Sequence, residues 1–223
     1  MITVHHLNHS RSQRVLWLLE ELELPYEIIK YERDPKTMLA PPSLEAIHPL
    51  GKSPVITDGD QTLAESGAIL EYLVETYGNG RLAPTPGTRE RHQYRYFMHY
   101  AEGSLMPYLL LKLVFYKVRT APVPFFVKPI AKKIADNVSA KFIDPNLTRH
   151  LRFLAGHLGT QPWFAGNELT AADIQMSYPV EAAVSRASDV GGSAAPLADF
   201  VKRCKARPAF QRALERGGPY DLD

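Results

Sequence analysis

Strand and helix signals alternate through the first eighty residues of this chain, and beyond them the strand signals nearly vanish. This change of pattern constrains the fold more than any single motif. Runs rich in β-branched and aromatic residues predict strands, and apolar residues at helical spacing predict helices. The expected order is β-α-β-α-β-β-α, with segments at 2–7, 14–24, 26–31, 41–43, 55–57, 61–64 and 66–77. It predicts two parallel strands joined through a helix, then a hairpin turned at Asp58-Gly59-Asp60 and a closing helix.

The rest of the chain is predicted to be helical. Gly78-Asn79-Gly80 ends the preceding helix, and a turn-rich linker follows at 82–87. Helices are expected at 89–105, 144–158, 170–184 and 196–216. The run Thr170-Ala171-Ala172-Asp173 has the pattern of a capping box, with Leu169 and Ile174 as the hydrophobic staple over it. We therefore expect an α/β domain at 1–80, a linker at 81–87 and an all-α domain at 88–223.

Composition excludes several classes of function. A net charge of +2 over 223 residues gives no reason to expect nucleic acid as a partner of the whole chain. No apolar run is long enough to span a bilayer, and the first residues lack the pattern of a secretory signal. A single cysteine, Cys204, excludes an internal disulfide framework and a CxxC site. His5, His6 and His9 lack metal-ligand spacing, so no metal is expected. We expect a cytoplasmic protein.

Two short motifs predict a pocket for a small extended peptide. Pro54 opens an apolar strand and has no N–H to donate, so it does not belong inside a central strand. A cis bond there would leave the N–H and C=O of Ser53 free to pair with a ligand's backbone. Glu65 and Ser66 stand at a helix start, where they would hold the ligand's amino end and carboxylate. Taken separately, the two motifs are also compatible with an ordinary turn and an ordinary helix cap.

With this order of elements, the chain resembles the cytosolic glutathione S-transferase family. The residues that carry the resemblance span nearly the whole chain and lie at 48–54, 65–69, 169–174 and 207–210. The start His9-Ser10-Arg11-Ser12 is similar to a serine-type branch found in fungi and bacteria rather than to the tyrosine-based animal classes.

The resemblance implies a thioredoxin-like N-terminal domain that holds glutathione and a helical domain that supplies most of an apolar pocket for the second substrate. Beside Pro54, Ser53 would pair its backbone with the cysteinyl unit, and Glu65 and Ser66 would take the γ-glutamyl end. Lys52 would face the glycine carboxylate, although it is also compatible with a solvated loop charge. Tyr108, Phe115 and Tyr116 are candidates for the electrophile pocket. The family also implies a homodimer.

The chemistry requires a thiolate, because the free thiol has a pKa of about 8.5 and is mostly protonated at neutral pH. A hydroxyl donor at the positive N-terminus of the first helix would stabilise it. By its similarity to the serine-type members, Ser10 is the first candidate, and the alternatives are Ser12, Asn8 and His9. Ser12 is also compatible with a helix N-cap role. No tyrosine or cysteine lies in this loop, which argues against a phenol donor and against a mixed-disulfide mechanism.

The predicted function is therefore transfer of glutathione to small electrophiles, as in detoxification, with reduction of organic peroxides as a possible second use of the same thiolate. A glutathione-dependent disulfide reductase would share the whole glutathione site and is the first alternative. A non-enzymatic binding module is the second, and it predicts a degraded glutathione loop. That loop is intact here, since Lys52, Ser53 and Pro54 are all present.

One further stretch is unusual in its charge. Between Glu102 and Asp136 the sequence has no acidic residue and six basic ones, interleaved with apolar residues, and prolines interrupt any single long helix. The prolines are Pro122, Pro124 and Pro129. One interpretation is a helix pair whose lysines extend along a solvated edge. The other is peripheral contact with an anionic membrane through residues 109–133.

Overall fold

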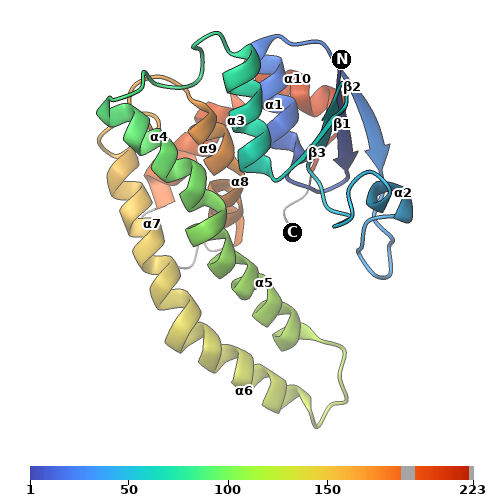
Figure 1. The fold of residues 1–223 in the computed structure, drawn as a ribbon. Helices are drawn as coiled ribbons and strands as arrows, with labels where there is room; N and C mark the ends of the chain where they lie inside the picture. The colour runs from blue at the N-terminus through green and yellow to red at the C-terminus, as the bar shows by residue number, and fades with distance from the viewer. Residues whose placement is uncertain (187–193, 221–223) are drawn as a thin grey trace.

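The computed structural model describes residues 1–186 and 194–220 and contains an α/β part followed by a helical part (Figure 1). The first part holds one mixed sheet of four strands in the order β2-β1-β3-β4. Its elements are β1 (Ile2–Leu7), α1 (Ser12–Leu22), β2 (Tyr26–Tyr31), α2 (Pro42–Glu45), β3 (Val55–Asp58), β4 (Gln61–Ala64) and α3 (Ser66–Tyr77). β1 pairs parallel with β2 and antiparallel with β3, and β3 pairs antiparallel with β4. The predicted order of elements along the chain, the parallel pairing of the first two strands and the hairpin are confirmed.

Helix α1 is buried on nearly every side because it lies between the sheet and two helices from the far end of the chain. Ten of its eleven residues are buried, including the polar Gln13 and Arg14. The helix begins two residues before the predicted 14–24 and ends two residues earlier. It ends where Glu23 adopts a left-handed conformation with φ of 58° and donates its N–H to Glu20. Pro25 then prevents the helix from continuing.

The second part is built on two long helical rods that run side by side (Figure 1). The first rod joins α4 (Arg89–Tyr100) to α5 (Met106–Thr120) through a π-helical turn, η1 (Ala101–Leu105). The second joins α6 (Lys128–Val138) to α7 (Asp144–Leu158) through η2 (Ser139–Ile143). The predicted end of a helix at residue 105 is therefore wrong. A π turn inserts a residue without breaking the helix.

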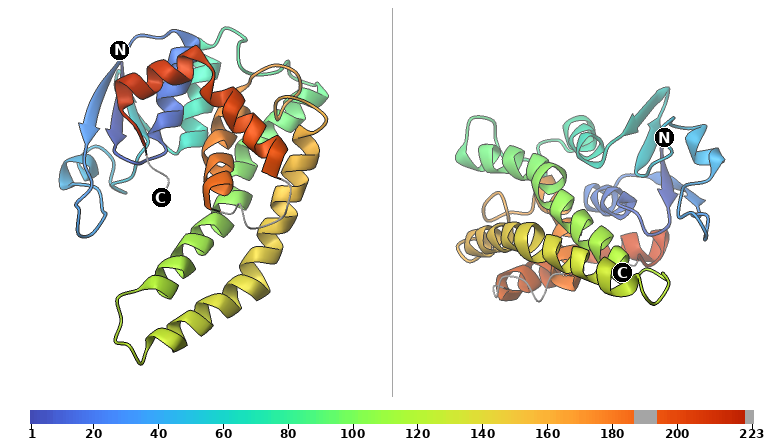
Figure 2. Two further views of the ribbon diagram at one scale, coloured as in Figure 1. Left: turned by 180° about the vertical axis from the view of Figure 1, so that it is seen from behind. Right: turned by 90° about the horizontal axis from the view of Figure 1, so that it is seen from below.

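The last three helices are α8 (Ala171–Arg186), α9 (Ala194–Lys205) and α10 (Pro208–Gly217). The prediction of one helix over 196–216 is wrong, because Pro208 interrupts it. Proline has no N–H for the helix and disfavours helical geometry in the preceding residue, and Arg207 is extended with ψ of 132°. The break lets α10 turn back and pack against α1 (Figure 2). Because α10 thus returns to the α/β part, the division at residues 80 and 88 stays a prediction.

Of the predicted capping box before α8, the bond from the Thr170 N–H to the Asp173 side chain is confirmed, whereas the Thr170 hydroxyl donates to Asp173 instead of accepting its N–H. Asp173 is fully buried and accepts hydrogen bonds from the N–H and hydroxyl of Thr170, both at 2.8 Å. It also accepts from the N–H of Phe164 at 2.6 Å, which fixes the loop before the helix. Burial raises the pKa of Asp173 to about 6 against the lowering effect of these donors. Among the described residues, no helix is both long and apolar enough to cross a membrane.

Candidate active site

The loop before β3 presents an unpaired stretch of backbone. The Ser53–Pro54 peptide bond is cis. Within the described part of the chain, neither the N–H nor the C=O of Ser53 has a hydrogen-bond partner. The hydroxyl of Ser53 is occupied instead: it donates to the carbonyl of His5 at 3.1 Å and accepts from the N–H of Leu7 at 3.4 Å. β1 therefore fixes the loop through this side chain and leaves the backbone of Ser53 available to a ligand.

The start of α3 offers a second group of ligand-binding atoms. Glu65 precedes the helix with φ of 71°, and its exposed side chain makes no capping bond. A non-glycine residue at positive φ costs about 1–3 kcal/mol, and such strain gathers at ligand sites. The first N–H groups of a helix have no partner inside it and carry partial positive charge. The carboxylate of Glu65 and these N–H groups therefore provide adjacent sites for an amino group and a carboxylate.

Ser66 is buried, and its hydroxyl oxygen is held by two donors from other elements. Arg14 Nη2 donates to it at 3.0 Å and Gln175 Nε2 at 3.4 Å. A serine oxygen has two lone pairs and one hydrogen. Because both lone pairs are used, the remaining function of this hydroxyl is to donate its own hydrogen. That hydrogen suits a carboxylate at the start of α3.

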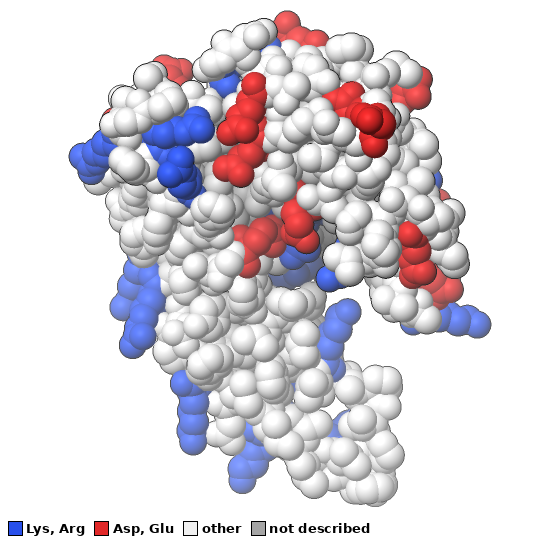
Figure 3. Space-filling view, viewed as in Figure 1, with Lys and Arg blue, Asp and Glu red and all other residues white. Residues whose placement is uncertain are grey.

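Arg14 connects the two parts of the chain behind this site, and the sequence analysis missed it. Its side chain is 2% exposed. It pairs with Glu102 Oε1 at 2.6 Å and donates to the carbonyl of Gln175 at 2.7 Å. Burial lowers the pKa of Arg14, and the carboxylate of Glu102 opposes that effect. Arg11 also pairs with Glu102, at 3.3 Å. In Figure 3 the surface is hollowed between the α/β part and the rods, and acidic and basic side chains meet there.

A chain of hydroxyl groups runs from the start of α1 to the loop before β3. Ser12 Oγ lies 2.8 Å from His6 Nδ1, and Ser10 Oγ lies 2.7 Å from Ser12 Oγ. Ser10 in turn donates to Ser53 Oγ at 3.2 Å. The N-cap position of α1 is occupied by Arg11, so the N-cap reading of Ser12 is wrong. Ser10 is the residue whose hydroxyl accepts the N–H of Ser12, at 3.3 Å.

The protonation state of His6 sets the direction of the hydrogen bond between His6 and Ser12. Burial and the charge of Lys30 lower the pKa of His6 to about 4, against the raising effect of a hydrogen bond to the backbone of Gly217. The ring is therefore neutral at pH 7. The proton lies on the nitrogen that meets Gly217, so Nδ1 accepts the hydrogen of Ser12. Ser12 has then spent its only hydrogen, whereas Ser10 can give its hydrogen to Ser12, to Ser53 or to a ligand.

The other candidates from the sequence lie in different surroundings. The side-chain oxygen of Asn8 accepts the N–H of Arg33 at 3.0 Å. His9 is exposed and has φ of 50°. Lys52 is exposed beside the cis bond. None of these three has its side chain in the hydroxyl chain described above.

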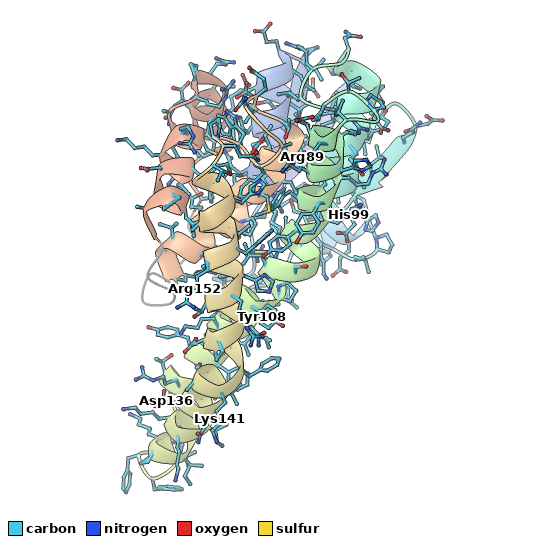
Figure 4. All side chains as sticks on the ribbon, turned by 90° about the vertical axis from the view of Figure 1, so that its left-hand side faces the viewer. Arg89, His99, Tyr108, Asp136, Lys141 and Arg152 are labelled. Carbon is cyan, nitrogen blue, oxygen red and sulfur yellow. The ribbon has the colours of Figure 1, made fainter. Side chains whose placement is uncertain are left out.

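The candidates for the electrophile pocket separate into two places. Phe115 and Tyr116 line a cavity of about 530 Å³ between α5, η2 and the end of α8. Tyr108 lies on the side of α5 that faces α7 (Figure 4), where its ring contacts His150 at a centroid distance of 5.2 Å. Among the described residues, the lining of the cavity includes none of the glutathione-site candidates.

The chain matches known proteins over almost its entire length. Residues 1–75 match the glutathione S-transferase N-terminal domain, and residues 118–216 match a glutathione S-transferase C-terminal domain. Glutathione S-transferase 3 of Schizosaccharomyces pombe is 38% identical over 183 residues, which cover 82% of this chain and 74% of that protein. Glutathione S-transferase 1 of Saccharomyces cerevisiae is 31% identical over 223 residues, which cover 97% of this chain and 95% of that protein.

Solved structures show the same likeness. A glutathione S-transferase from Actinobacillus pleuropneumoniae has a TM-score of 0.78 at 27% identity and covers 100% of this chain and 95% of its own. A glutathione transferase from Phanerochaete chrysosporium, in complex with oxidized glutathione, has a TM-score of 0.73 at 25% identity, and the match covers 97% of this chain and 96% of that one. The likeness therefore extends over both parts of the fold.

Proposed function

Because the chain belongs to the glutathione S-transferase family and so is an enzyme that transfers glutathione, we propose that glutathione lies between the loop before β3 and the start of α3, with its sulfur at Ser10. One observation carries this placement. Ser10 Oγ lies 3.2 Å from Ser53 Oγ, so the proposed thiol donor is next to the residue that offers its backbone to the cysteinyl unit.

Each part of glutathione has a partner in this placement. The cysteinyl N–H and C=O pair with the backbone of Ser53, as an added strand would. The α-carboxylate of the γ-glutamyl unit accepts the hydroxyl hydrogen of Ser66 and N–H groups at the start of α3. The amino group meets the exposed carboxylate of Glu65, and the glycine carboxylate meets Lys52.

The proposed role of Ser10 follows from the hydrogen of its hydroxyl, which can turn from Ser12 or Ser53 to a bound sulfur. A hydrogen bond from Ser10 Oγ to the sulfur stabilises the thiolate, and the positive end of α1 adds to the effect. The thiolate then attacks an electrophilic carbon and forms a C–S bond while the leaving group departs. The same thiolate attacks an organic hydroperoxide, breaks its O–O bond and releases the alcohol, and a second glutathione converts the resulting sulfenic acid to glutathione disulfide and water, which gives the enzyme a second activity. Ser12 is a weaker candidate because it gives its hydrogen to His6.

The test is to substitute Ser10→Ala and to measure conjugation of an aromatic halide, together with the pKa of the bound thiol from the ultraviolet absorbance of the thiolate. Removing a donor to a developing negative charge typically costs about 100-fold or more in turnover. We expect a loss of that order, a raised thiol pKa and an almost unchanged affinity for glutathione by calorimetry. Ser12→Ala is the matched variant. Unchanged turnover and thiol pKa in Ser10→Ala would remove Ser10 from the mechanism, and a loss confined to Ser12→Ala would assign the role to Ser12.

We also propose that two copies form a homodimer. Tyr96 on α4 and Phe153 on α7 are half-exposed, and their rings lie 6.2 Å apart at the centroids. Arg89 and His99 on α4 and Arg152 on α7 lie along the same two helices in Figure 4. Half-exposed aromatic rings beside arginine are typical of interfaces. Light scattering of the wild type and of Tyr96→Ala/Phe153→Ala tests this: a monomer in the wild type contradicts it, and a monomer in the variant alone supports it.

A further inference from the structure

The hairpin between α5 and α6 projects from the body of the molecule (Figures 1 and 4). Its end carries a concentration of exposed apolar side chains. We define the hairpin tip as residues 110–134. Sixteen large apolar residues are exposed in the described chain, and eight of them lie in these 25 residues. They are Leu110, Val114, Tyr116, Val118, Phe125, Phe126, Ile130 and Ile134. A random scatter over the surface would not place half of them in about a ninth of the chain.

The most exposed of these residues form a compact group at the turn. Phe125 is 82% exposed and Phe126 is 65% exposed, and their rings contact each other at a centroid distance of 5.6 Å. Ile130 and Ile134 stand four residues apart on α6, so they share one face of that helix. The group therefore combines two adjacent aromatic rings with an apolar helix face. In the part of the chain that the structure describes, no other element covers it.

Basic residues, like the exposed apolar ones, are concentrated in the hairpin. Residues 106–135 contain six basic residues and no acidic one, while the whole chain has a net charge of only +2, which leaves −4 for the rest. Lys112 pairs with Asp144 and Arg119 with Asp136 at the inner part of the hairpin. The other four, all exposed, are Lys117, Lys128, Lys132 and Lys133. In Figure 3 the acidic side chains lie on the body, and the hairpin shows only basic ones.

We propose that the hairpin tip is a peripheral anchor for anionic membranes. Phe125 and Phe126 lie at the level of the lipid headgroups, where aromatic side chains are favoured. Lys128, Lys132 and Lys133 lie against the negative lipid phosphates, and each such lysine is worth about fivefold in affinity. Apolar insertion and charge attraction act together at one end of the molecule, as peripheral binding requires.

A second copy of the chain is a poorer occupant of this surface. In a two-fold dimer the same patch meets itself. Beyond the basic residues that pair with Asp136 and Asp144, the two hairpins would bring together eight exposed lysines, four from each copy. Such juxtaposition of like charges costs several kcal/mol in an interface and selects against that pairing. The charge of the tip is instead complementary to an anionic lipid surface.

Co-sedimentation with vesicles tests the proposal. The wild type is expected to bind vesicles of phosphatidylcholine with phosphatidylserine, more weakly as salt is added, and not vesicles of phosphatidylcholine alone. Phe125→Ser/Phe126→Ser is expected to lose at least about tenfold in partitioning, because both inserted rings are removed. Lys128→Gln/Lys132→Gln/Lys133→Gln is expected to lose about 100-fold. Both variants should keep the wild-type rate of glutathione conjugation in solution, so the result does not depend on the proposed role of Ser10.

Matched variants separate the tip from general surface properties. Lys30→Gln/Lys36→Gln/Lys202→Gln removes the same charge from exposed lysines elsewhere, and Ile29→Ser removes an exposed apolar side chain from β2. Both should bind anionic vesicles like the wild type. Equal losses in the two lysine triples would overturn the proposal, as would an absence of binding at low salt. A change from dimer to monomer in Phe125→Ser/Phe126→Ser would overturn it too, and would make a second copy the occupant.

Discussion

His6 makes a testable link between the candidate site and the stability of the fold. It is 6% exposed, and burial followed by the charge of Lys30 lowers its pKa from 6.5 to about 4. In the unfolded chain the ring is in water and takes up a proton below about pH 6.5. The native state binds that proton only near pH 4. His6 therefore contributes stability that is present above pH 6.5 and is lost as the pH falls toward 4.

The size of the effect follows from the two pKa values. With 6.5 for the unfolded and about 4 for the native chain, the free energy of unfolding falls by about 2 kcal/mol between pH 7 and pH 5. By pH 4 the loss from this one group reaches about 3 kcal/mol. Asp173 acts in the opposite direction, since its pKa is raised from 3.8 to about 6 and its contribution declines as the pH rises through that range.

The assay is urea unfolding of the wild type and of His6→Gln at pH 7 and at pH 5. Glutamine keeps one acceptor for Ser12 and one donor for the backbone of Gly217 but does not titrate. Because Asp173 and the other titrating groups are common to both proteins, the difference between their pH dependences isolates His6. We expect the wild type to lose about 2 kcal/mol more than the variant. His92→Gln, at an exposed histidine, controls for the substitution itself. Parallel losses in the wild type and His6→Gln would refute the reasoning.

Four further substitutions, one of them a control, test the packing of the fold and of the site. Gly217→Ala would place a Cβ 2.5 Å from Leu16 Cδ1 and should lower the free energy of unfolding, measured by chemical denaturation, by about 1–3 kcal/mol. Gly156→Ala, in open space inside α7, should raise it by about 0.5–1 kcal/mol, and equal effects of the two substitutions would contradict this account. Asp173→Ala leaves its buried donors without an acceptor and should cost about 2–4 kcal/mol in the same assay. Arg14→Met removes a donor to Ser66, so calorimetry should show glutathione affinity about tenfold weaker; unchanged affinity would contradict that role.

The parts of the fold that the sequence predicted well are those with local boundaries. The strands at 2–7 and 26–31 and the helix at 66–77 agree with the structure to the residue, and so does the helix end at 158. The predicted helix start at 144 is wrong in the same way as the predicted end at 105, because η2 joins α6 to α7 there. Each is bounded by signals within a few residues, such as Pro25 before the second strand and Gly78 after the helix. The errors fall where the local signal was weak or overridden. The π turn at 101–105 has no distinctive pattern of apolar residues. The helical spacing of apolar residues continues on both sides of Pro208, so the pattern did not indicate that the helix ends there.

The residues of the candidate site also separate into those that local sequence signals predict and those that depend on distant contacts. The sequence predicted four residues of the site because neighbouring residues indicate a turn and a helix start there. They are Ser53, Pro54, Glu65 and Ser66. Arg14 was not, because its partners Glu102 and Gln175 lie 88 and 161 residues away along the chain. A charged residue among the apolar residues of a helix was the only available signal. Arg14 is buried because α1 lies between the sheet and α8, an arrangement that the local sequence does not show.

The hydroxyl chain connects Ser10 to His6, but the assignment of Ser10 holds for either charge of His6. A neutral His6 takes the hydrogen of Ser12, and Ser10 then holds the hydrogen that can turn from Ser12 or Ser53 to the sulfur. A charged His6 would donate to Ser12 instead. Ser12 would then give its hydrogen to Ser10, and the hydrogen of Ser10 would point to Ser53 or to the sulfur. Ser10 thus keeps its role in either state, whereas Ser12 never directs its hydrogen out of the chain. His6→Gln should therefore flatten the pH dependence of stability while Ser10→Ala alone raises the thiol pKa.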